Sequence, residues 1–182
     1  MRLLLHTCCA PCTIFPVEYL RTQGYEVYGY FFNPNIHPYT EWLKRKEALQ
    51  NYAQVVQLEM LYDEGYQLEE FLQQVVYRKK NRCLFCYAFR LHQAAKIAKE
   101  ENFNIFSTTL LVSPYQQHDL IKEIGKAAGA KNGLTFHYVD FRPGFRKAQK
   151  QAKELNLYRQ QYCGCILSER DRYYPKVSRK KR

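Results

Sequence analysis

The cysteines of this chain are gathered in three short groups, near its start, middle and end. All seven in the 182 residues fall in these groups: Cys8, Cys9 and Cys12 in HTCCAPC, Cys83 and Cys86 in RCLFC, and Cys163 and Cys165 in YCGC. Two or three thiols at one point can hold a metal ion, hold an iron–sulfur cluster or exchange electrons. Buried, inert cysteine is a reasonable interpretation for any one of them, but a poor one for seven in groups.

The first two groups have the spacing of a metal site. Ala10-Pro11 is typical of a helix start, so the first group surrounds a helix N-terminus, whose dipole favours thiolate. Cys83-x-x-Cys86 also precedes a predicted helix. The spacing alone leaves zinc and iron–sulfur open. Because adjacent side chains diverge, neighbouring cysteines favour a cluster with several irons over one zinc ion.

The third group is a C-x-C pair. Cys163 and Cys165 can close a small strained disulfide, because Gly164 permits unusual backbone angles. A strained disulfide is easily reduced and suits a redox shuttle. The alternative is that one of the two thiols ligates a metal.

Strand and helix patterns alternate along the chain, and these elements must position the thiols. Apolar and β-branched runs predict strands at Arg2–Thr7, Tyr25–Phe32, Gln54–Met60, Asn104–Thr109 and Thr135–Asp140. Periodicity and capping signals predict helices at Pro11–Thr22, Glu41–Tyr52, Tyr66–Tyr77, Tyr87–Glu101, from Ser113 to near Gly125 or Gly129, and at Phe145–Leu155. The alternation predicts an α/β fold, a parallel sheet with helices on both faces.

One rim of this predicted sheet collects the candidate site residues. Function in parallel sheets gathers beyond the carboxyl ends of the strands. Cys8, Asn33 and Asp140 each follow a predicted strand, as do Thr108 and Thr109, so the cysteine motifs are expected at this C-terminal rim. The segment from 61 to 102 is longer than one crossover needs, and we expect it to be an insertion that carries the C-x-x-C motif over the rim.

Length and composition fit one globular domain. A chain of this size buries about 70% of its unfolded surface and needs no disulfide for stability. No stretch approaches the length of a membrane span, and the opening lacks an export signal. We therefore expect a cytoplasmic protein without membrane contact, where grouped cysteines serve as metal ligands or redox centres.

The formal net charge is +11, with sixteen tyrosines and eleven phenylalanines. This composition suits a polyanion with stackable bases, although a solvated basic surface explains it equally well. The basic residues directly before Cys83 are candidates for substrate binding: Arg78, Lys79, Lys80 and Arg82. A basic tail from about 174 to 182 ends the chain.

Weaker signals mark further candidates on the rim. Asn33 and His37 lie in the proline-rich FFNPNIHP segment; His37 can contact substrate or form a hydrogen bond within its loop. Asp140 and Arg142 end a predicted strand and can be catalytic or can pair with each other.

Six segments in chain order resemble one known family, the QueH epoxyqueuosine reductases. They are HTCCAPC, FFNPNIHPYTEW, RCLFC followed by YAFRL, STTLLVSPYQ, DFRPG and LYRQQYCGCILS, which run from residue 6 to residue 168. The resemblance implies a cobalamin-independent enzyme for the final step of queuosine biosynthesis. It would reduce epoxyqueuosine to queuosine at the wobble position of tRNA with a GUN anticodon. It also implies the Rossmann-like fold of the adenine nucleotide alpha-hydrolase group.

The same resemblance implies cofactors and roles. The ligands of a [4Fe-4S] cluster map to Cys8, Cys9, Cys83 and Cys86, and a redox-active disulfide maps to Cys163 and Cys165. Cys12 has no assigned role; a second metal ion next to the cluster would be one use for it. The electron donor is unidentified, and Tyr162, His37 and Asp140 are candidates for the proton donor. Two other classes stay open: a zinc-stabilised RNA-binding module and a thiol–disulfide oxidoreductase.

Overall fold

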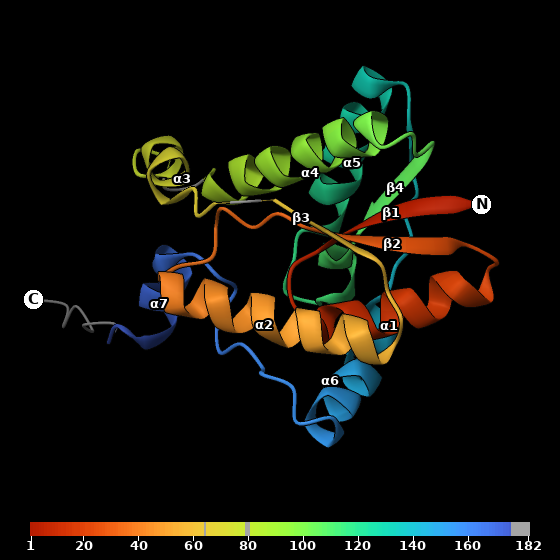
Figure 1. Cartoon of the computed structure of the whole chain (residues 1–182). Helices are drawn as coiled ribbons and strands as arrows, with labels where there is room; N and C mark the ends of the chain where they lie inside the picture. The colour runs from red at the N-terminus through yellow and green to blue at the C-terminus, as the bar shows by residue number, and fades with distance from the viewer. Residues whose placement is uncertain (64, 79–80, 176–182) are drawn as a thin grey trace, which may run out of the picture.

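The structure is a computed structural model that describes residues 1–63, 65–78 and 81–175 (Figure 1). The strands are β1 (Arg2–Thr7), β2 (Glu26–Phe31), β3 (Met60–Tyr62), β4 (Ile105–Thr108) and β5 (Thr135–Phe136). The helices are α1 (Ala10–Thr22), α2 (Tyr39–Val55), α3 (Leu68–Val75), α4 (Arg82–Glu100), α5 (His118–Asn132), α6 (Phe145–Glu154) and α7 (Ile166–Tyr173), with 3-10 turns η1 (Thr109–Val112) and η2 (Arg142–Gly144).

The five strands form one parallel sheet in the order β3-β2-β1-β4-β5. The chain builds outwards from β1 through β2 and β3, then crosses back to place β4 on the other side of β1. The strand order therefore reverses between β1 and β4, where His6 pairs in register with Thr108. In open parallel sheets this reversal creates a crevice at the carboxyl ends of the strands, in which ligands bind.

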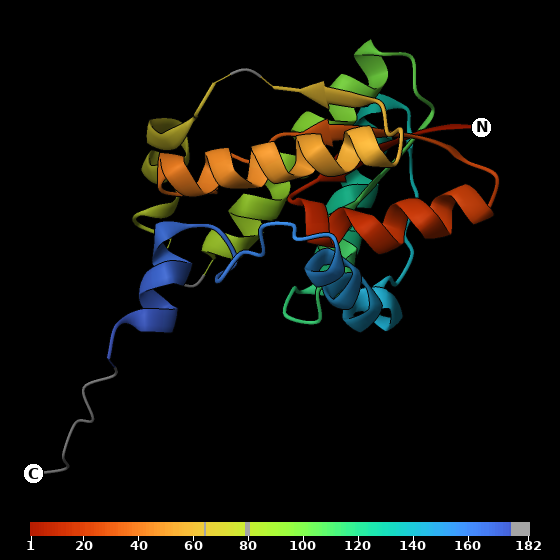
Figure 2. The same cartoon turned by 60° about the horizontal axis from the view of Figure 1, so that its bottom comes forward.

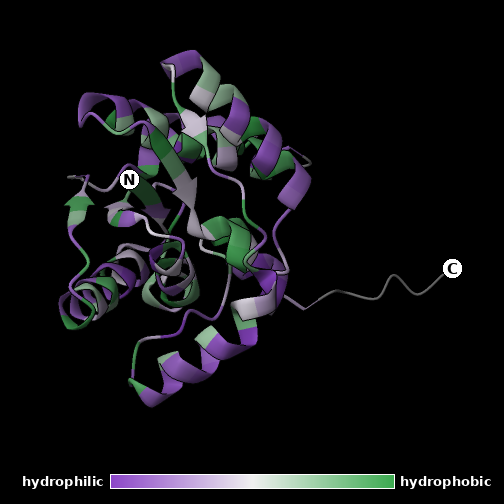
Figure 3. Cartoon of the chain, turned by 90° about the vertical axis from the view of Figure 1, so that its right-hand side faces the viewer, coloured by the Kyte–Doolittle hydropathy of each residue, from purple (hydrophilic) through white to green (hydrophobic). Residues whose placement is uncertain are grey.

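Helices cover both faces of the sheet. Helices α1, α2 and α6 lie on one face, and α4 and α5 lie on the other (Figure 1). The central strand reads Leu3-Leu4-Leu5, all fully buried, as expected for a parallel strand covered on both sides. Hydrophobic residues accordingly concentrate in the strands, and hydrophilic residues on the outer faces of the helices (Figure 3). Among the residues that the structure describes, no helix is both long and apolar enough to span a membrane.

Two short helices lie apart from these layers. α3 and α7 both lie at the end of the molecule opposite the N-terminus, beyond the carboxyl ends of the strands (Figures 1 and 2). α7 directly follows Cys165, which is its N-cap, and the sequence analysis did not predict this helix. The reason is that none of its residues is buried, so it has no apolar stripe to detect.

Two predicted strands differ from those observed. The strand predicted at Gln54–Met60 is wrong, because α2 continues to Val55 and only Met60–Tyr62 joins the sheet. The apolar residues between them lie on a helix end and a turn, where Gln57 takes a φ of 51°. The strand predicted at Thr135–Asp140 stops at Phe136.

Several predicted helices have different boundaries. The helix start predicted at Ser113 is wrong, because α5 begins at His118, after the buried η1 and a turn. α3 is shorter than predicted. α4 begins at Arg82 instead of Tyr87, so Cys83 and Cys86 lie within the helix and not before it.

Candidate functional site

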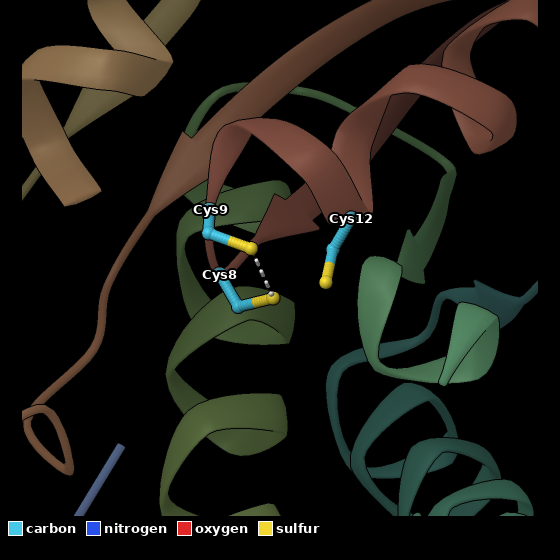
Figure 4. Close-up of side chains that lie close together, drawn as sticks. All are labelled: Cys8, Cys9 and Cys12. Atoms are coloured by element: carbon cyan, nitrogen blue, oxygen red, sulfur yellow. Dashed lines mark hydrogen bonds between the residues drawn. The ribbon is translucent and has the colours of Figure 1, made fainter. Parts of the chain in front are cut away.

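Three cysteines meet at the carboxyl end of β1. Cys8 follows the strand directly, Cys9 is the N-cap of α1, and Cys12 lies in its first turn. Their sulfur atoms lie within 4.8 Å of one another, with 3.7 Å between the Sγ atoms of Cys8 and Cys9 (Figure 4). Within the described part of the chain, no other group of His, Cys, Asp and Glu is so compact. The adjacent thiols of Cys8 and Cys9 thus converge and do not diverge as expected.

The three thiols of this triad have different pKa values. Hydrogen bonds from Cys12 and Cys9 hold the pKa of Cys8 well below its usual range, and the charge of Arg90 and the hydroxyl of Thr109 add to this effect. Burial raises the pKa of Cys9, and the pKa of Cys12 rises because its thiol donates towards Cys8 and Cys9. A thiolate flanked by two thiols is suited to a soft metal ion or an iron–sulfur cluster, which displaces the remaining protons.

The triad lies at the point where the strand order reverses. The backbone N–H of Cys8 donates to Thr109 Oγ1 at 3.1 Å, and the Thr109 hydroxyl lies 3.4 Å from Cys8 Sγ. Thr109 is the first residue after β4, so the triad is anchored to the strand on the other side of the crevice. This is the position that parallel sheets use for ligands.

A cavity of about 720 Å³ opens in front of the triad. Cys8 and Cys12 border it on one side, and Cys163 borders it from the C-terminal segment. Its wall also includes four arginines: Arg45, Arg90, Arg159 and Arg172. The cavity is therefore large enough for a nucleoside-sized group, and its wall is strongly cationic.

Cys83 and Cys86 border a second, smaller cavity of about 180 Å³. They stand three residues apart in the first turns of α4, so they share one face of the helix. Cys163 and Cys165 line the same cavity. Burial raises the pKa of Cys83, and it raises that of Cys86 to about 12. The C-x-x-C and C-x-C motifs thus line the same small cavity, and the three cysteines of the triad do not.

Arg90 on α4 borders both cavities. Its guanidinium is buried, donates to Asn33 Oδ1 at 2.7 Å and lies 4.0 Å from Cys86 Sγ. The same charge acts on Cys8 and, after burial, helps to lower the pKa of His6 to about 3. Arg90 therefore provides a positive charge to two separate groups of thiols.

The C-x-C segment is held from several directions. Arg45 donates to the carbonyl oxygens of Tyr162 and Cys163, each at 3.0 Å, and Gln116 Nε2 donates to Cys163 Sγ at 3.4 Å. Cys165 Sγ accepts from the backbone N–H of Ser168 at 3.3 Å, as the N-cap of α7. Both thiols are free.

His37 and Asn33 support loops and do not line either cavity. Asn33 Nδ2 donates to the carbonyl of Thr7 at 2.9 Å. The His37 ring donates from Nε2 to the carbonyl of Pro34 at 3.0 Å, and Nδ1 accepts from the backbone N–H of Ile166 at 3.4 Å. Of the two interpretations of His37, the structure favours the hydrogen bond within its loop.

Asp140 and Arg142 pair with each other at 2.6 Å on the surface. Hydrogen bonds from Arg142 lower the pKa of Asp140 to about 2. Neither residue borders the cavities, so of their two interpretations the structure favours simple pairing.

The basic run before Cys83 is only partly described. Arg82 borders the second cavity and forms an ion pair with Asp171 of α7 at 2.5 Å. The Arg78 guanidinium lies over the Phe85 ring at 5.6 Å. Lys79, Lys80 and the basic tail from 176 to 182 lie outside the described residues.

Sequence reasoning missed three residues that border the large cavity, namely Arg45, Arg90 and Tyr115. A signal existed for the two arginines: Arg45 falls on the α2 face that carries Trp42 and Leu49, and Arg90 falls beside buried Leu91 on α4. A charged residue on the buried face of a helix needs a partner, which marks a polar site. No comparable signal distinguishes Tyr115 from the other fifteen tyrosines.

Comparisons with known sequences agree over nearly the whole chain. The family model described as "Epoxyqueuosine reductase QueH" matches residues 3–171. A protein of that name from Dehalococcoides mccartyi is 37% identical over 172 residues, which cover 94% of each chain. Another from Thermotoga maritima is 35% identical over 190 residues, which cover 98% of this chain and 96% of its own.

Comparisons with solved structures concern the fold. The U34-tRNA thiolase NcsA from Methanococcus maripaludis, solved with its [4Fe-4S] cluster, has a TM-score of 0.59 at 12% identity. The match covers 88% of this chain but only 59% of the thiolase. A predicted subunit of tRNA methyltransferase from Methanocaldococcus jannaschii has a TM-score of 0.54 at 11% identity and is covered to 76%. The predicted α/β fold class is confirmed.

Proposed function

Because the chain belongs to the epoxyqueuosine reductase QueH family, we propose that it reduces epoxyqueuosine to queuosine at the wobble position of tRNA. This is the final step of queuosine biosynthesis, on tRNA with a GUN anticodon, and we place it in the cytoplasm. One observation carries the proposal: the triad of Cys8, Cys9 and Cys12 faces a cavity that also reaches Cys163.

The reaction removes the epoxide oxygen as water. The substrate takes up two electrons and two protons while both carbon–oxygen bonds of the epoxide break and a carbon–carbon double bond forms. The dithiol of Cys163 and Cys165 holds this number of electrons and protons, and it gives them up when it closes to a disulfide. Epoxide and dithiol therefore yield alkene, water and disulfide. An external electron donor returns the disulfide to the dithiol.

For the cofactor, we propose that a [4Fe-4S] cluster is held by Cys8, Cys9, Cys83 and Cys86. Such a cluster, when bound, supplies electrons one at a time. The donor chemistry fits, because all four ligands are thiols and the buried Arg90 acts on both groups: its charge lowers the pKa of Cys8, and its guanidinium lies 4.0 Å from Cys86 Sγ. Cys12 then stays available beside the cluster for a second metal ion.

The chain's own residues position the reacting thiols. Arg45 donates hydrogen bonds to the backbone carbonyls of Tyr162 and Cys163. Gln116 Nε2 donates a hydrogen bond to the Cys163 sulfur. Of the three candidate proton donors, Tyr162 is the one that borders the large cavity. Burial raises its pKa to about 12, so its phenol keeps its proton at neutral pH.

The test is turnover under anaerobic conditions. The protein is reconstituted with iron and sulfide and then mixed with a strong reductant and with tRNA that carries epoxyqueuosine. The tRNA is digested, and its nucleosides are separated and identified by mass spectrometry. We expect epoxyqueuosine to be replaced by queuosine, and about four irons and four acid-labile sulfides per chain for this cluster type. Stoichiometric zinc without acid-labile sulfide, or unchanged epoxyqueuosine, would contradict the proposal.

A further inference from the structure

One aromatic ring at the mouth of the site is exposed without an evident structural purpose. Tyr115 is 85% exposed, yet it borders both the large cavity and the small one. Exposed tyrosines are common on protein surfaces. Tyr77 is even more exposed, at 92%, but borders neither cavity. The location of Tyr115, and not its exposure alone, requires an explanation.

The backbone beneath the ring is firmly held. Tyr115 lies in the turn between η1 and α5, and its neighbour Gln116 accepts a hydrogen bond from the hydroxyl of Tyr87 at 2.6 Å. The backbone N–H of Gln117 donates to the same hydroxyl at 3.4 Å, and the ring of His118 donates to the carbonyl of Ser113 at 3.2 Å. The exposed ring is therefore presented by a fixed segment, so little conformational entropy is lost when a ligand stacks on it.

A second aromatic ring and an arginine whose guanidinium has no partner among the described residues also border the large cavity beside Tyr115. Phe145 also borders the large cavity, and its ring stands nearly perpendicular to that of Tyr115, at 86° and 6.3 Å between centroids. Arg159 also borders the large cavity, and its guanidinium forms no hydrogen bond or ion pair within residues 1–63, 65–78 and 81–175. Asp171, the one carboxylate on the cavity wall among the described residues, is already paired with Arg82 and Arg170.

We propose that Tyr115 is a stacking platform for a nucleobase of the RNA substrate, and that Arg159 contacts a phosphate of the same strand. The inference rests on the proposed function, because it assumes an RNA substrate. Single-stranded RNA bases are commonly bound by stacking on aromatic side chains, with basic residues along the backbone. Tyr115 offers such a ring at the entrance to the cavity, where an anticodon base must pass or stay.

The test measures the affinity for a short anticodon stem-loop RNA with a GUN anticodon, by fluorescence anisotropy of the holoprotein at fixed salt. We expect Tyr115→Ala to weaken binding between about 5-fold and 150-fold, the effect of losing one base stacked on an aromatic side chain. Tyr115→Phe keeps the ring and should bind like the parent. Tyr77→Ala is the matched control, because it removes a similarly exposed ring outside both cavities, and it should also bind like the parent.

Salt dependence separates stacking from charge. Arg159→Gln should reduce the log–log slope of affinity against salt by about 0.7, the value for one phosphate contact in a single strand. Tyr115→Ala should leave the slope unchanged. Parental affinity in Tyr115→Ala, equal losses in the Phe and Ala variants, or an equal loss in Tyr77→Ala would overturn the inference. Turnover is scored separately: a parent protein that binds the RNA without reducing epoxyqueuosine contradicts the proposed function and leaves the stacking site intact.

Discussion

Arg45 donates a hydrogen bond to the backbone carbonyl of Cys163 at 3.0 Å, although the two residues lie 118 positions apart in the chain. The Arg45 side chain is 1% exposed and is paired with Glu41 one helical turn earlier, at 2.7 Å. Glu41 in turn accepts a hydrogen bond from the hydroxyl of Tyr158. A buried ion pair on α2 thus connects this covering helix to the segment that carries the C-x-C thiols.

The first prediction concerns this ion pair. Arg45→Met leaves the Glu41 carboxylate buried without its cation, which typically costs about 3–5 kcal/mol of unfolding free energy. The double variant Glu41→Gln, Arg45→Met removes both charges and should recover part of that loss. Urea unfolding of the single and double variants measures the difference. The two side chains act independently if the double variant is less stable than Arg45→Met by the full loss in unfolding free energy that Glu41→Gln causes alone.

The second prediction separates ligands from redox thiols. Cys8→Ser and Cys83→Ser each remove a proposed ligand, so we expect substoichiometric iron and a strongly reduced visible absorption after anaerobic reconstitution. Cys163→Ser and Cys165→Ser should retain parental iron and lose turnover, because the proposed role of this pair is to carry electrons and not to hold iron. Iron loss in either variant of the C-x-C pair would show that these thiols are ligands.

The positions of the cysteines relative to the sheet could be predicted from the sequence. The pattern of alternating strands and helices is local, and in a parallel sheet the carboxyl ends of all strands lie on one edge. Cys8 and Thr109 accordingly meet there at hydrogen-bond distance. The sequence also placed Cys8, Cys9 and Cys12 around one helix start, but the close approach of the adjacent Cys8 and Cys9 thiols was not predicted, because neighbouring side chains were expected to diverge.

Other parts of the site depend on contacts between distant segments and could not be predicted. α7 buries none of its residues, and it is positioned by the Arg82–Asp171 ion pair and by His37, which no periodicity reveals. The burial of Arg45 likewise depends on carbonyl oxygens more than a hundred residues later.

The third prediction is a pH dependence that originates at His37. Burial lowers the pKa of His37 below its ordinary value, and Nδ1 must stay unprotonated to accept from Ile166. In the unfolded chain, His37 takes up a proton as pH falls through about 6.5, while the folded state resists that proton, so stability is full above this pH and decreases below it. The titratable neighbours Tyr66 and Tyr162 have raised pKa values and stay neutral in this range.

The measurement is the unfolding free energy of the parent and of His37→Gln between pH 8 and pH 5. Other histidines contribute equally to both proteins, so the difference between them isolates His37. We expect the variant to lose less stability than the parent on acidification. Parallel pH profiles would mean that His37 is protonated equally well in the folded state.

The last prediction concerns the glycine between the two thiols of the C-x-C motif. Gly164 has a φ of +154°, and a Cβ at this position would stand 2.9 Å from Asn35 Nδ2 and 3.3 Å from Ile36 Cγ1. Its backbone is also bonded, since the N–H of His37 donates to the Gly164 carbonyl at 2.9 Å. Gly164→Ala therefore combines backbone strain with a steric clash, and we expect a loss of about 1–3 kcal/mol in stability.

Because the strain falls between Cys163 and Cys165, we expect turnover to decrease by at least about tenfold, the effect of roughly 1.4 kcal/mol, with iron content unchanged. Gly24→Ala is the matched control. Gly24 also has a left-handed φ, of +78°, but nothing lies within 4 Å of its would-be Cβ, and it is remote from the cavities. This control should lose some stability and keep parental turnover per folded protein. If Gly164→Ala also keeps parental turnover, the geometry of the C-x-C segment does not limit the reaction, and its two thiols act without the fixed backbone that Arg45 and His37 provide.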